Sequence, residues 1–556
     1  MKHKFLFAAL LVVLTVLLGV SFVAGGTDSV AVIVQADSVE TAAAIVDAYG
    51  GELNEQLAII NAVSATLPSS VLEAVAADAR TVALHQDEEA SVAGINAARR
   101  GNRLDATFPE VMGVDDVWAD RVWGKRIGVA VVDTGIALDT WNVRRVVARY
   151  DALDNGARLR DPHGHGTMMA SLIGNDTTDA NGYIGIAPKV QFIDVRALDA
   201  EGKGTYTDII EGLNWILANK NRYNIRVVNL SLLGGISSPY WADPINQAVE
   251  ALWEAGIVVV AAAGNEGPEP MTIAAPGNDP FVITVGAFTD NYTPDDPSDD
   301  YVTPFSGAGP TEVGFVKPDV VAPGAHMLTT APAGSTWVRQ NREARVTGNY
   351  FEIAGTSSAT AVTSGLVALM LDENPHMTPN EVKYALMASA QPAAYDDGTL
   401  AWSIFQQGAG RVWAPAAVLD PAEGEANAGM IPGEPYVGPV VYRDGQFVLV
   451  DENGEPLAGT EGYSWVGGYS WVGGYSWVGG YSWVGGYSWV GGYSWVGNTD
   501  WDEWTQEDVW QSGYSWVGGY SWVGGYSWVG GYSWVGGYSW VGGYSWVGVG
   551  LTPFEE

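Results

Sequence analysis

Three short segments combine a reactive side chain with neighbouring glycines. They are residues 127–135, which contain Asp133, residues 161–170, which contain His163 and His165, and residues 355–361, which contain Ser357. A serine becomes a nucleophile when a base takes its hydroxyl proton and a carboxylate orients that base. The three segments supply one residue for each task, in the order Asp, His, Ser, and together they predict nucleophilic serine chemistry.

Each of these residues taken alone has an ordinary structural explanation. An Asp after a strand or a Ser at the start of a helix is commonly a helix cap. Two histidines two residues apart, His163 and His165, could bind a metal ion, but no further His or Cys cluster lies near them in the sequence. Only the combination favours catalysis.

The order and the flanking residues resemble those of the subtilisin-like serine peptidases. The resemblance covers roughly residues 108–419 and implies that Asp133 orients the base, that His165 rather than His163 is the base, and that Ser357 is the nucleophile. It also implies that Asn265, in the segment Gly-Asn-Glu-Gly, stabilises the oxyanion with the Ser357 backbone N–H. Two glycine-bearing segments resemble the family's substrate-pairing edges, which predicts that substrate is bound by Gly202, Gly204, Ser231, Leu232 and Gly234.

The chain departs from the family pattern at three places. Met168 stands where a histidine is usual, Ala361 where a proline is usual, and the segment from Ser231 to Gly234 carries one extra leucine. None of these changes removes a catalytic group. We expect them to affect substrate preference.

Short Val, Ile and Ala runs alternate with amphipathic segments through residues 108–420, which we predict to be the peptidase domain. We expect strands at 127–132, 190–195, 225–231, 257–262 and 281–285, and helices at 207–219 and 244–255. Continuous apolar strands of this kind suit a parallel sheet with helices on both faces. The fold class is therefore α/β, and the resemblance makes it a subtilisin-like sheet.

Residues 29–85 alternate apolar strands and helical segments, which predicts a small α+β unit with Ser38 and Ser69 as helix N-caps. By resemblance, residues 27–90 are an inhibitory propeptide of ferredoxin-like fold, and residues 91–107 link it to the enzyme. Before it, basic residues and an apolar run in residues 1–25 are typical of a signal peptide. An uncleaved membrane anchor is the alternative.

Composition excludes several classes of function. The formal charge of −37, from 64 acidic and 27 basic residues, disfavours nucleic acid and anionic membranes as partners. The absence of cysteine excludes disulfides, thiolate catalysis and cysteine-bound metals. The chemistry requires no cofactor. A structural calcium ion could bind the acidic loop of Asp290, Asp295, Asp296, Asp299 and Asp300, although a solvated loop is the simpler interpretation.

The C-terminal region, residues 462–556, repeats the hexapeptide Tyr-Ser-Trp-Val-Gly-Gly. Six copies start at Tyr463 and six more at Tyr514, and a linker with a predicted Asp-Gly hairpin, residues 421–461, precedes them. The repeats could form a solenoid with stacked aromatics, a series of tight hairpins, or a disordered tail, and their aromatic content favours a β form.

These patterns predict a secreted, self-processing endopeptidase. Its partners would be protein or peptide substrates and its own propeptide, which would inhibit it. The repeats could contact a cell surface or a polysaccharide. The rival hypothesis is a surface or adhesion protein whose function lies in the repeats, but such a protein has no need of Asp133, His165, Ser357 and Asn265 together.

Overall fold

The computed structural model describes residues 29–97, 106–153, 161–179, 181–395, 400–443, 446–451, 454 and 456, together with 527–528 and 546–547. The predicted signal peptide and nearly all of the aromatic repeat lie outside these residues. The chain divides into two compact units, residues 1–88 and 89–556. In the part that the structure describes, no helix is both long and apolar enough to cross a membrane.

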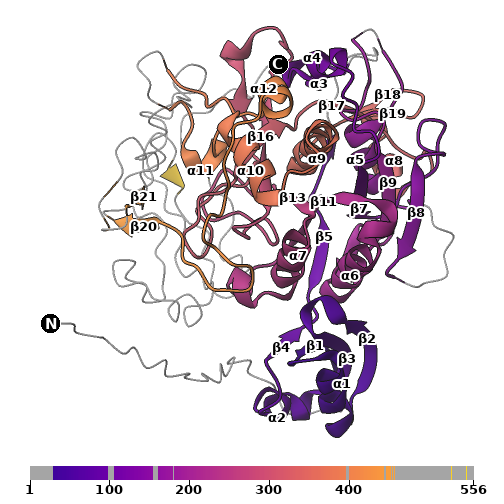
Figure 1. Ribbon diagram of the computed structural model, residues 1–556, viewed down its shortest axis with the longest axis vertical. Coiled ribbons are helices and arrows are strands. Elements are labelled where there is room, and N and C mark those ends of the chain that lie inside the picture. The colour runs from indigo at the N-terminus through magenta and orange to yellow at the C-terminus, as the bar shows by residue number, and fades with distance from the viewer. Residues whose placement is uncertain are drawn as a thin grey trace. The chain divides into compact units, whose positions relative to one another are not determined.

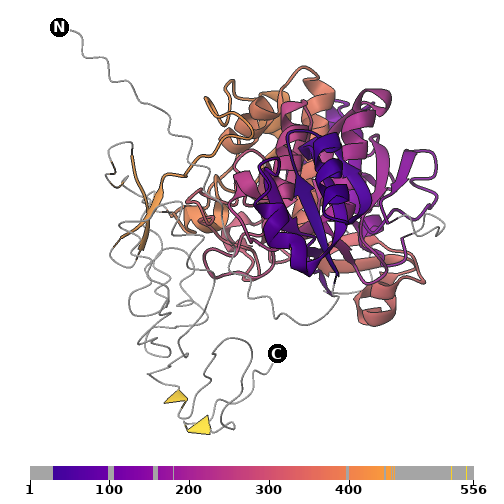
Figure 2. The ribbon, with the colours of Figure 1, turned by 90° about the horizontal axis from the view of Figure 1, so that it is seen from below.

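The first unit is a four-stranded antiparallel sheet with two helices. In chain order its elements are β1 (Ser29–Gln35), α1 (Val39–Ala48), β2 (Glu52–Leu57), β3 (Ala62–Pro68), α2 (Leu72–Ala76) and β4 (Ala83–Gln86). The strands are arranged β2-β3-β1-β4, which is the ferredoxin-like order. Figures 1 and 2 give two views of this unit, in indigo.

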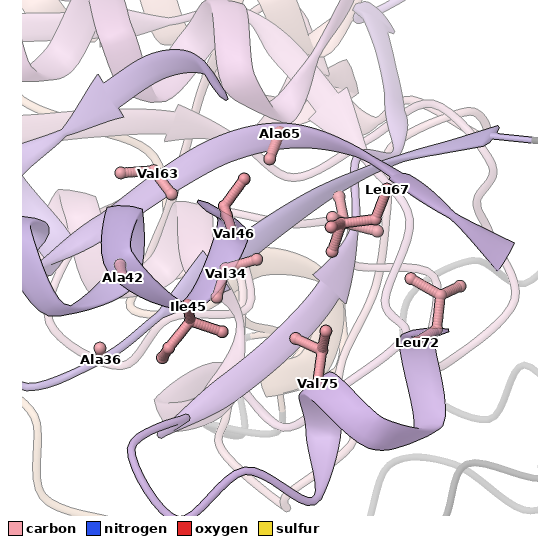
Figure 3. Close-up of a cluster of buried hydrophobic side chains, with 11 residues drawn as sticks. Val34, Ala36, Ala42, Ile45, Val46, Val63, Ala65, Leu67, Leu72 and Val75 are labelled. Atoms are coloured by element: carbon pink, nitrogen blue, oxygen red, sulfur yellow. The ribbon is translucent and has the colours of Figure 1, made fainter. Parts of the chain in front are cut away.

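Both helices of the first unit pack on the same core. Figure 3 shows Ile45 and Val46 of α1 and Leu72 and Val75 of α2 gathered with side chains of β1 and β3 such as Val63. Burial of these aliphatic side chains is what holds so small a unit together.

The cap predicted at Ser38 is confirmed, because its hydroxyl accepts a hydrogen bond from Thr41 N at 3.2 Å. The cap predicted at Ser69 is wrong. Ser69 begins a short 3₁₀ turn, and the helix that follows it has no side-chain cap.

The second unit contains an eight-stranded sheet. Its strands are β7 (Gly128–Asp133), β8 (Val146–Asp151), β9 (Gln191–Arg196), β11 (Ile225–Leu230), β13 (Val258–Ala262), β14 (Ile283–Thr289), β15 (Tyr301–Val302) and β16 (Val320–Pro323). The order is β15-β14-β13-β11-β7-β9-β8, with β16 also paired to β14. All pairs are parallel except β14 with β15, so the predicted parallel sheet carries one antiparallel strand.

Helices cover both faces of this sheet. α5 (His165–Gly174) packs on α9 (Thr356–Glu373), and α6 (Tyr206–Tyr223) packs on α7 (Pro244–Glu254). Figure 1 shows the two pairs on opposite sides of β13, β11 and β7. Every residue of β7, β13 and β14 is buried, as the continuous apolar runs predicted.

Smaller elements complete the second unit. The helices are α3 (Phe108–Val111), α4 (Val114–Ala119), α8 (Thr336–Gln340), α10 (Pro379–Ala388), α11 (Ile404–Gln407) and α12 (Ala414–Leu419). The strands are β5 (Glu89–Val92), β6 (Asn96–Ala97), β10 (Lys203–Thr205), β12 (Leu232–Gly234), β17 (Met327–Thr330), β18 (Arg345–Thr347), β19 (Tyr350–Ala354), β20 (Val440–Arg443) and β21 (Gln446–Leu449). β20 and β21 pair in antiparallel fashion around residues 444–445, which confirms the predicted hairpin.

Candidate active site

Asp133 and His165 meet at the carboxyl edge of the sheet. Asp133 is the last residue of β7, and His165 is the first residue of α5. His165 Nδ1 lies 2.8 Å from both carboxylate oxygens of Asp133, and both side chains are fully buried. Among the described residues, His165 Nε2 has no hydrogen-bond partner, so this nitrogen is available to take a proton.

Glycine makes this approach possible. A Cβ atom on Gly166 would lie 2.2 Å from the carbonyl oxygen of Gly135, which belongs to the loop after Asp133. Gly164, just before His165, has a φ of 107°, a conformation that residues with a side chain rarely adopt. The glycines around the histidine therefore let the two loops touch.

Ser357 is the second residue of α9, which packs against α5. Its side chain is fully buried, and its hydroxyl donates to the carbonyl oxygen of Ala93 at 2.7 Å. Ser357 lies in the first turn of the helix, where the positive end of the helix dipole favours negative charge.

Asn265 lies in the loop after β13 and uses both ends of its side-chain amide. Oδ1 accepts from the backbone N and from the hydroxyl of Thr356, each at 2.9 Å. Nδ2 donates to the carbonyl oxygen of Gly94. The oxygen of the amide is thus fixed to the start of α9, and its nitrogen is aimed at the carbonyl oxygen of Gly94.

The five residues predicted to bind substrate line a strand of the chain itself. β5 lies between β10 and β12 and is antiparallel to both. Val92 N donates to Gly202 O at 2.9 Å, and Ala93 N donates to Ser231 O at 3.0 Å. In the ladder, Ala90 is opposite both Gly204 and Gly234, and Val92 is opposite Leu232.

The segment then continues past Ser357. β6 pairs with β19, with Asn96 opposite Ala354. Residues 89–97, part of which we expected to be a linker, therefore run across the site in extended form with a β-pairing partner on each side of Ala93 and Gly94. Extended backbone held by strand pairing is how a peptide is presented for cleavage.

His163 occupies a different environment from His165. Burial, followed by the nearby His165, lowers the pKa of His163 to about 4, and its Nδ1 has no hydrogen-bond partner among the described residues. The two rings lie 6.2 Å apart between centroids. His163 is therefore a neutral neighbour of the Asp133–His165 pair.

The acidic loop considered for calcium is held by protein donors. Asp290 accepts a hydrogen bond from Thr107 Oγ1 and contacts His326. Asp299 accepts hydrogen bonds from Asn291 and Thr293. Asp296 accepts a hydrogen bond from the backbone N of Ser298. Asp300 pairs with Arg411. Throughout the described ranges, no three His, Asp or Glu side chains are grouped as a metal ion would require.

Sequence reasoning missed two residues at the site. Thr134 follows Asp133, and its N donates to Asp133 Oδ1 at 2.7 Å. Asp161 precedes His165 by four residues and is 3% exposed, with all its hydrogen bonds inside the two loops. In the sequence, Asp161 is followed by a proline and lies just before a glycine-rich helix start. An aspartate in that position is usually interpreted as a helix cap.

Comparison with known proteins gives a consistent result. Residues 124–410 match the model of the Subtilase family. The serine protease AprX of Bacillus subtilis is 40% identical over 274 residues, which cover 47% of this chain and 61% of that protein. The extracellular serine proteinase of Thermus sp. is 30% identical over 336 residues, covering 60% of this chain and 72% of the relative.

A solved structure shares the fold. The crystal structure of fervidolysin from Fervidobacterium pennivorans, described as a keratinolytic enzyme related to subtilisin, matches with a TM-score of 0.57 and 21% identity over 78% of this chain and 69% of that one. The family match spans the sheet, Asp133, His165 and Ser357 alike. The chain therefore belongs to the subtilase family of serine-type endopeptidases.

Proposed function

We propose that this chain is a secreted serine endopeptidase that hydrolyses proteins through an acyl-enzyme intermediate. His165 Nε2 takes the proton of Ser357 Oγ as that oxygen bonds to the substrate carbonyl carbon, and Asp133 stabilises the charged imidazole. The proton then passes to the leaving amine as the C–N bond breaks, and water repeats the cycle to release the acyl group. Asn265 Nδ2 and Ser357 N stabilise the oxyanion.

The observation that carries this proposal is the position of residues 89–97. A peptide segment is paired with β10 and β12, and the carbonyl group of its last paired residue, Ala93, is in contact with the Ser357 hydroxyl. For attack on the carbonyl carbon, the hydroxyl proton must turn to His165 Nε2, which has no competing partner among the described residues. The site therefore holds a substrate-like peptide against Ser357, the proposed nucleophile.

The test compares Ser357→Ala with wild type and with Ser358→Ala. Ser358 is the adjacent serine, fully buried, and its Oγ has no hydrogen-bond partner among the described residues, so it is a matched control. We expect Ser357→Ala to abolish casein hydrolysis and labelling by a serine-directed phosphonate, whereas Ser358→Ala retains both. Equal labelling of wild type and Ser357→Ala would refute the proposal.

We further propose that the enzyme cleaves its own chain between Ala93 and Gly94, separating the propeptide, residues 27–90, that inhibits it. Ala93 is fully buried, its N–H donates to Ser231 O and its carbonyl oxygen accepts from Ser357 Oγ, whereas Gly94 is exposed, which supports Ala93 as the residue whose side chain the site holds. Asn265 Nδ2 donates to the next carbonyl oxygen, Gly94 O, so its oxyanion role at Ala93 requires this donor to shift by one residue. Mass spectrometry of the secreted protein should find a new N-terminus at Gly94, and none in Ser357→Ala. An N-terminus at Ile95 would shift the bond by one residue, and an equally processed Ser357→Ala would exclude self-cleavage.

The same mass spectra test secretion through the predicted signal peptide, residues 1–25. For the aromatic repeats we propose contact with a cell surface or polysaccharide, supported by the twelve aromatic copies in the sequence. Deleting residues 462–548 should reduce retention of the enzyme on cells or polysaccharide without changing casein hydrolysis. Unchanged retention would argue against this role.

A further inference from the structure

Asp161 is a buried carboxylate that the proposed reaction does not use. Oδ1 accepts from the hydroxyl of Thr134 at 2.7 Å and from Gly164 N at 2.5 Å, and Oδ2 accepts from Thr167 N at 2.8 Å. Gly164 and Thr167 lie on either side of His165 in the chain. The carboxylate therefore holds the backbone just before and just after the base.

Thr134 extends this contact to the other member of the pair. Its hydroxyl, which donates to Asp161, also accepts from Gly166 N at 3.0 Å, and its own backbone N donates to the Asp133 carboxylate. Asp133, Thr134, Asp161 and the first turn of α5 thus form a closed ring of hydrogen bonds. The direct bond between Asp133 and His165 is one side of this ring.

Asp161 also resembles an ordinary helix cap, since it accepts N–H groups from the first turn of α5. Two features distinguish Asp161 from an ordinary helix cap. The side chain is buried, and one of its oxygens is bonded to the threonine that follows Asp133 rather than to α5 alone. A cap stabilises a helix, whereas a bond to Thr134 also sets where that helix begins relative to the Asp133 loop.

We propose that Asp161, acting through Thr134, is a positioning residue that fixes His165 against Asp133. The proposal rests on the proposed function, because it concerns how the base of that reaction is held. Neither residue contacts the substrate-like segment through any described hydrogen bond. Their contribution is geometric, and a displacement of about 1 Å in a catalytic group can lower a rate about 100-fold.

The chemistry of the carboxylate makes this contact sensitive to substitution. Every described neighbour of the two oxygens is a donor, so the ring needs a side chain that only accepts. Burial raises the pKa of Asp161, and the hydrogen bonds from Gly164, Thr167 and Thr134 oppose that rise. In Asp161→Asn, the amide NH₂ must face either Thr167 N–H or Gly164 N–H, and neither backbone group can reverse its role.

Four variants test the proposal: Asp161→Asn, Thr134→Val, Thr134→Ser and Asp243→Asn. Asp243→Asn is the matched control, because Asp243 is a buried aspartate that caps α7 through Ile245 N and Asn246 N. We expect Asp161→Asn and Thr134→Val to lower kcat about 100-fold with KM changed little, and Thr134→Ser, which keeps the hydroxyl, to restore most of kcat. Rates are normalised to the folded fraction, so that a loss of stability is not counted as a loss of catalysis.

A second measurement does not depend on activity. In the inactive Ser357→Ala background, the low-field proton resonance of His165 Nδ1–H reports the bond to Asp133. We expect Asp161→Asn and Thr134→Val to shift or remove this resonance, and Asp243→Asn to leave it unchanged. If Asp161→Asn does not fold, Thr134→Val carries the same comparison.

The outcomes separate this proposal from the proposed function. An active wild type in which Asp161→Asn behaves like Asp243→Asn in both kcat and the resonance overturns the positioning role and leaves the peptidase assignment standing. A wild type without peptidase activity overturns the proposed function. In that case, a resonance lost only in Asp161→Asn and Thr134→Val would still support the structural role of the ring.

Discussion

Asn265 and His163 show how much the environment of a single residue decides. Asn265 is oriented by the start of α9, which donates to its amide oxygen, and its amide nitrogen donates to Gly94 of the substrate-like segment. His163 lies two residues from His165, but no described hydrogen bond joins it to a carboxylate. The same residue type therefore gives a proposed base at one position and an uncharged side chain at the other.

Replacing the donor of Asn265 should slow the chemical step. We expect Asn265→Ala to lower kcat about 10²- to 10³-fold, with a smaller effect on KM, because an oxyanion donor acts mainly in the transition state. Asn265→Asp keeps an oxygen for Thr356 but loses the donor, so it should be impaired as well. Steady-state kinetics check this against Glu266→Ala, an exposed neighbour. A wild-type kcat in Asn265→Asp would contradict the role.

His163 should make the fold less stable in acid. Because burial lowers its pKa to about 4, the unfolded chain takes up a proton near pH 6.5 while the folded chain does not. Its stability contribution is therefore full above pH 6.5 and is lost as pH falls from 6.5 to 4. Melting temperatures in the Ser357→Ala background, which avoids self-digestion, should fall less on acidification in His163→Asn. The exposed His376→Asn is the control, and an identical fall in all three proteins would refute this prediction.

At the scale of elements, the site depends on strand ends and helix starts that approach one another closely. β7 ends at Asp133, α5 starts at His165, and α9 starts at Thr356 against Asn265. Parallel strands bring their carboxyl ends to one edge, where α/β proteins place their sites. The contact between the loop after β7 and the start of α5 leaves no space for a side chain at Gly166.

Gly166→Ala should therefore disrupt the site. Its Cβ would meet the backbone oxygen of Gly135, which cannot move as the end of a flexible side chain can, and overpacking of this kind costs about 1–3 kcal/mol. We expect a lower melting temperature and loss of phosphonate labelling. Gly334→Ala is the control, since no atom lies within 4 Å of the added Cβ and the residue is exposed. Equal labelling of the two variants would show that the loops can separate at no cost.

At the scale of the whole molecule, the described residues that follow α12 pack against and hydrogen-bond to the rest of the second unit. Ala426 N bonds to Asn380 O, and Val440 N bonds to Gly314 O. Tyr436 N bonds to the hydroxyl of Tyr240, and Val440 and Phe447 form a buried cluster with Phe405. We expected residues 421–461 to be a linker with a hairpin, and the described part of it contributes its own packing.

Truncation should reveal this contribution. In the Ser357→Ala background, a chain ending at Asp420 should melt at a lower temperature than one ending at residue 461, because it exposes Phe405 and leaves Gly314 O without its N–H partner. The chain ending at residue 461 should melt like the full chain. Equal melting temperatures for the two truncated chains would mean that residues 421–461 act only as a linker and add no stability.

The local sequence was sufficient wherever local physics decides. Continuous apolar runs predicted β7, β9, β11, β13 and β14, because strands buried on both faces need no polar alternation. Ser38 was found as a cap because a hydroxyl before a helix satisfies a free N–H. β2 was missed because five of its six residues are exposed and it carries little apolar pattern.

Only the tertiary structure decided how distant residues share hydrogen bonds. The sequence determined that Asp133, His165 and Ser357 stand in the order and setting of a subtilase. It did not show that residues 89–97 form strands, since a short extended segment gains its hydrogen bonds from partners more than 100 residues away. Nor did it show that Asp161 is joined to Thr134. A buried carboxylate is identified by its donors, and the fold alone brings those donors together.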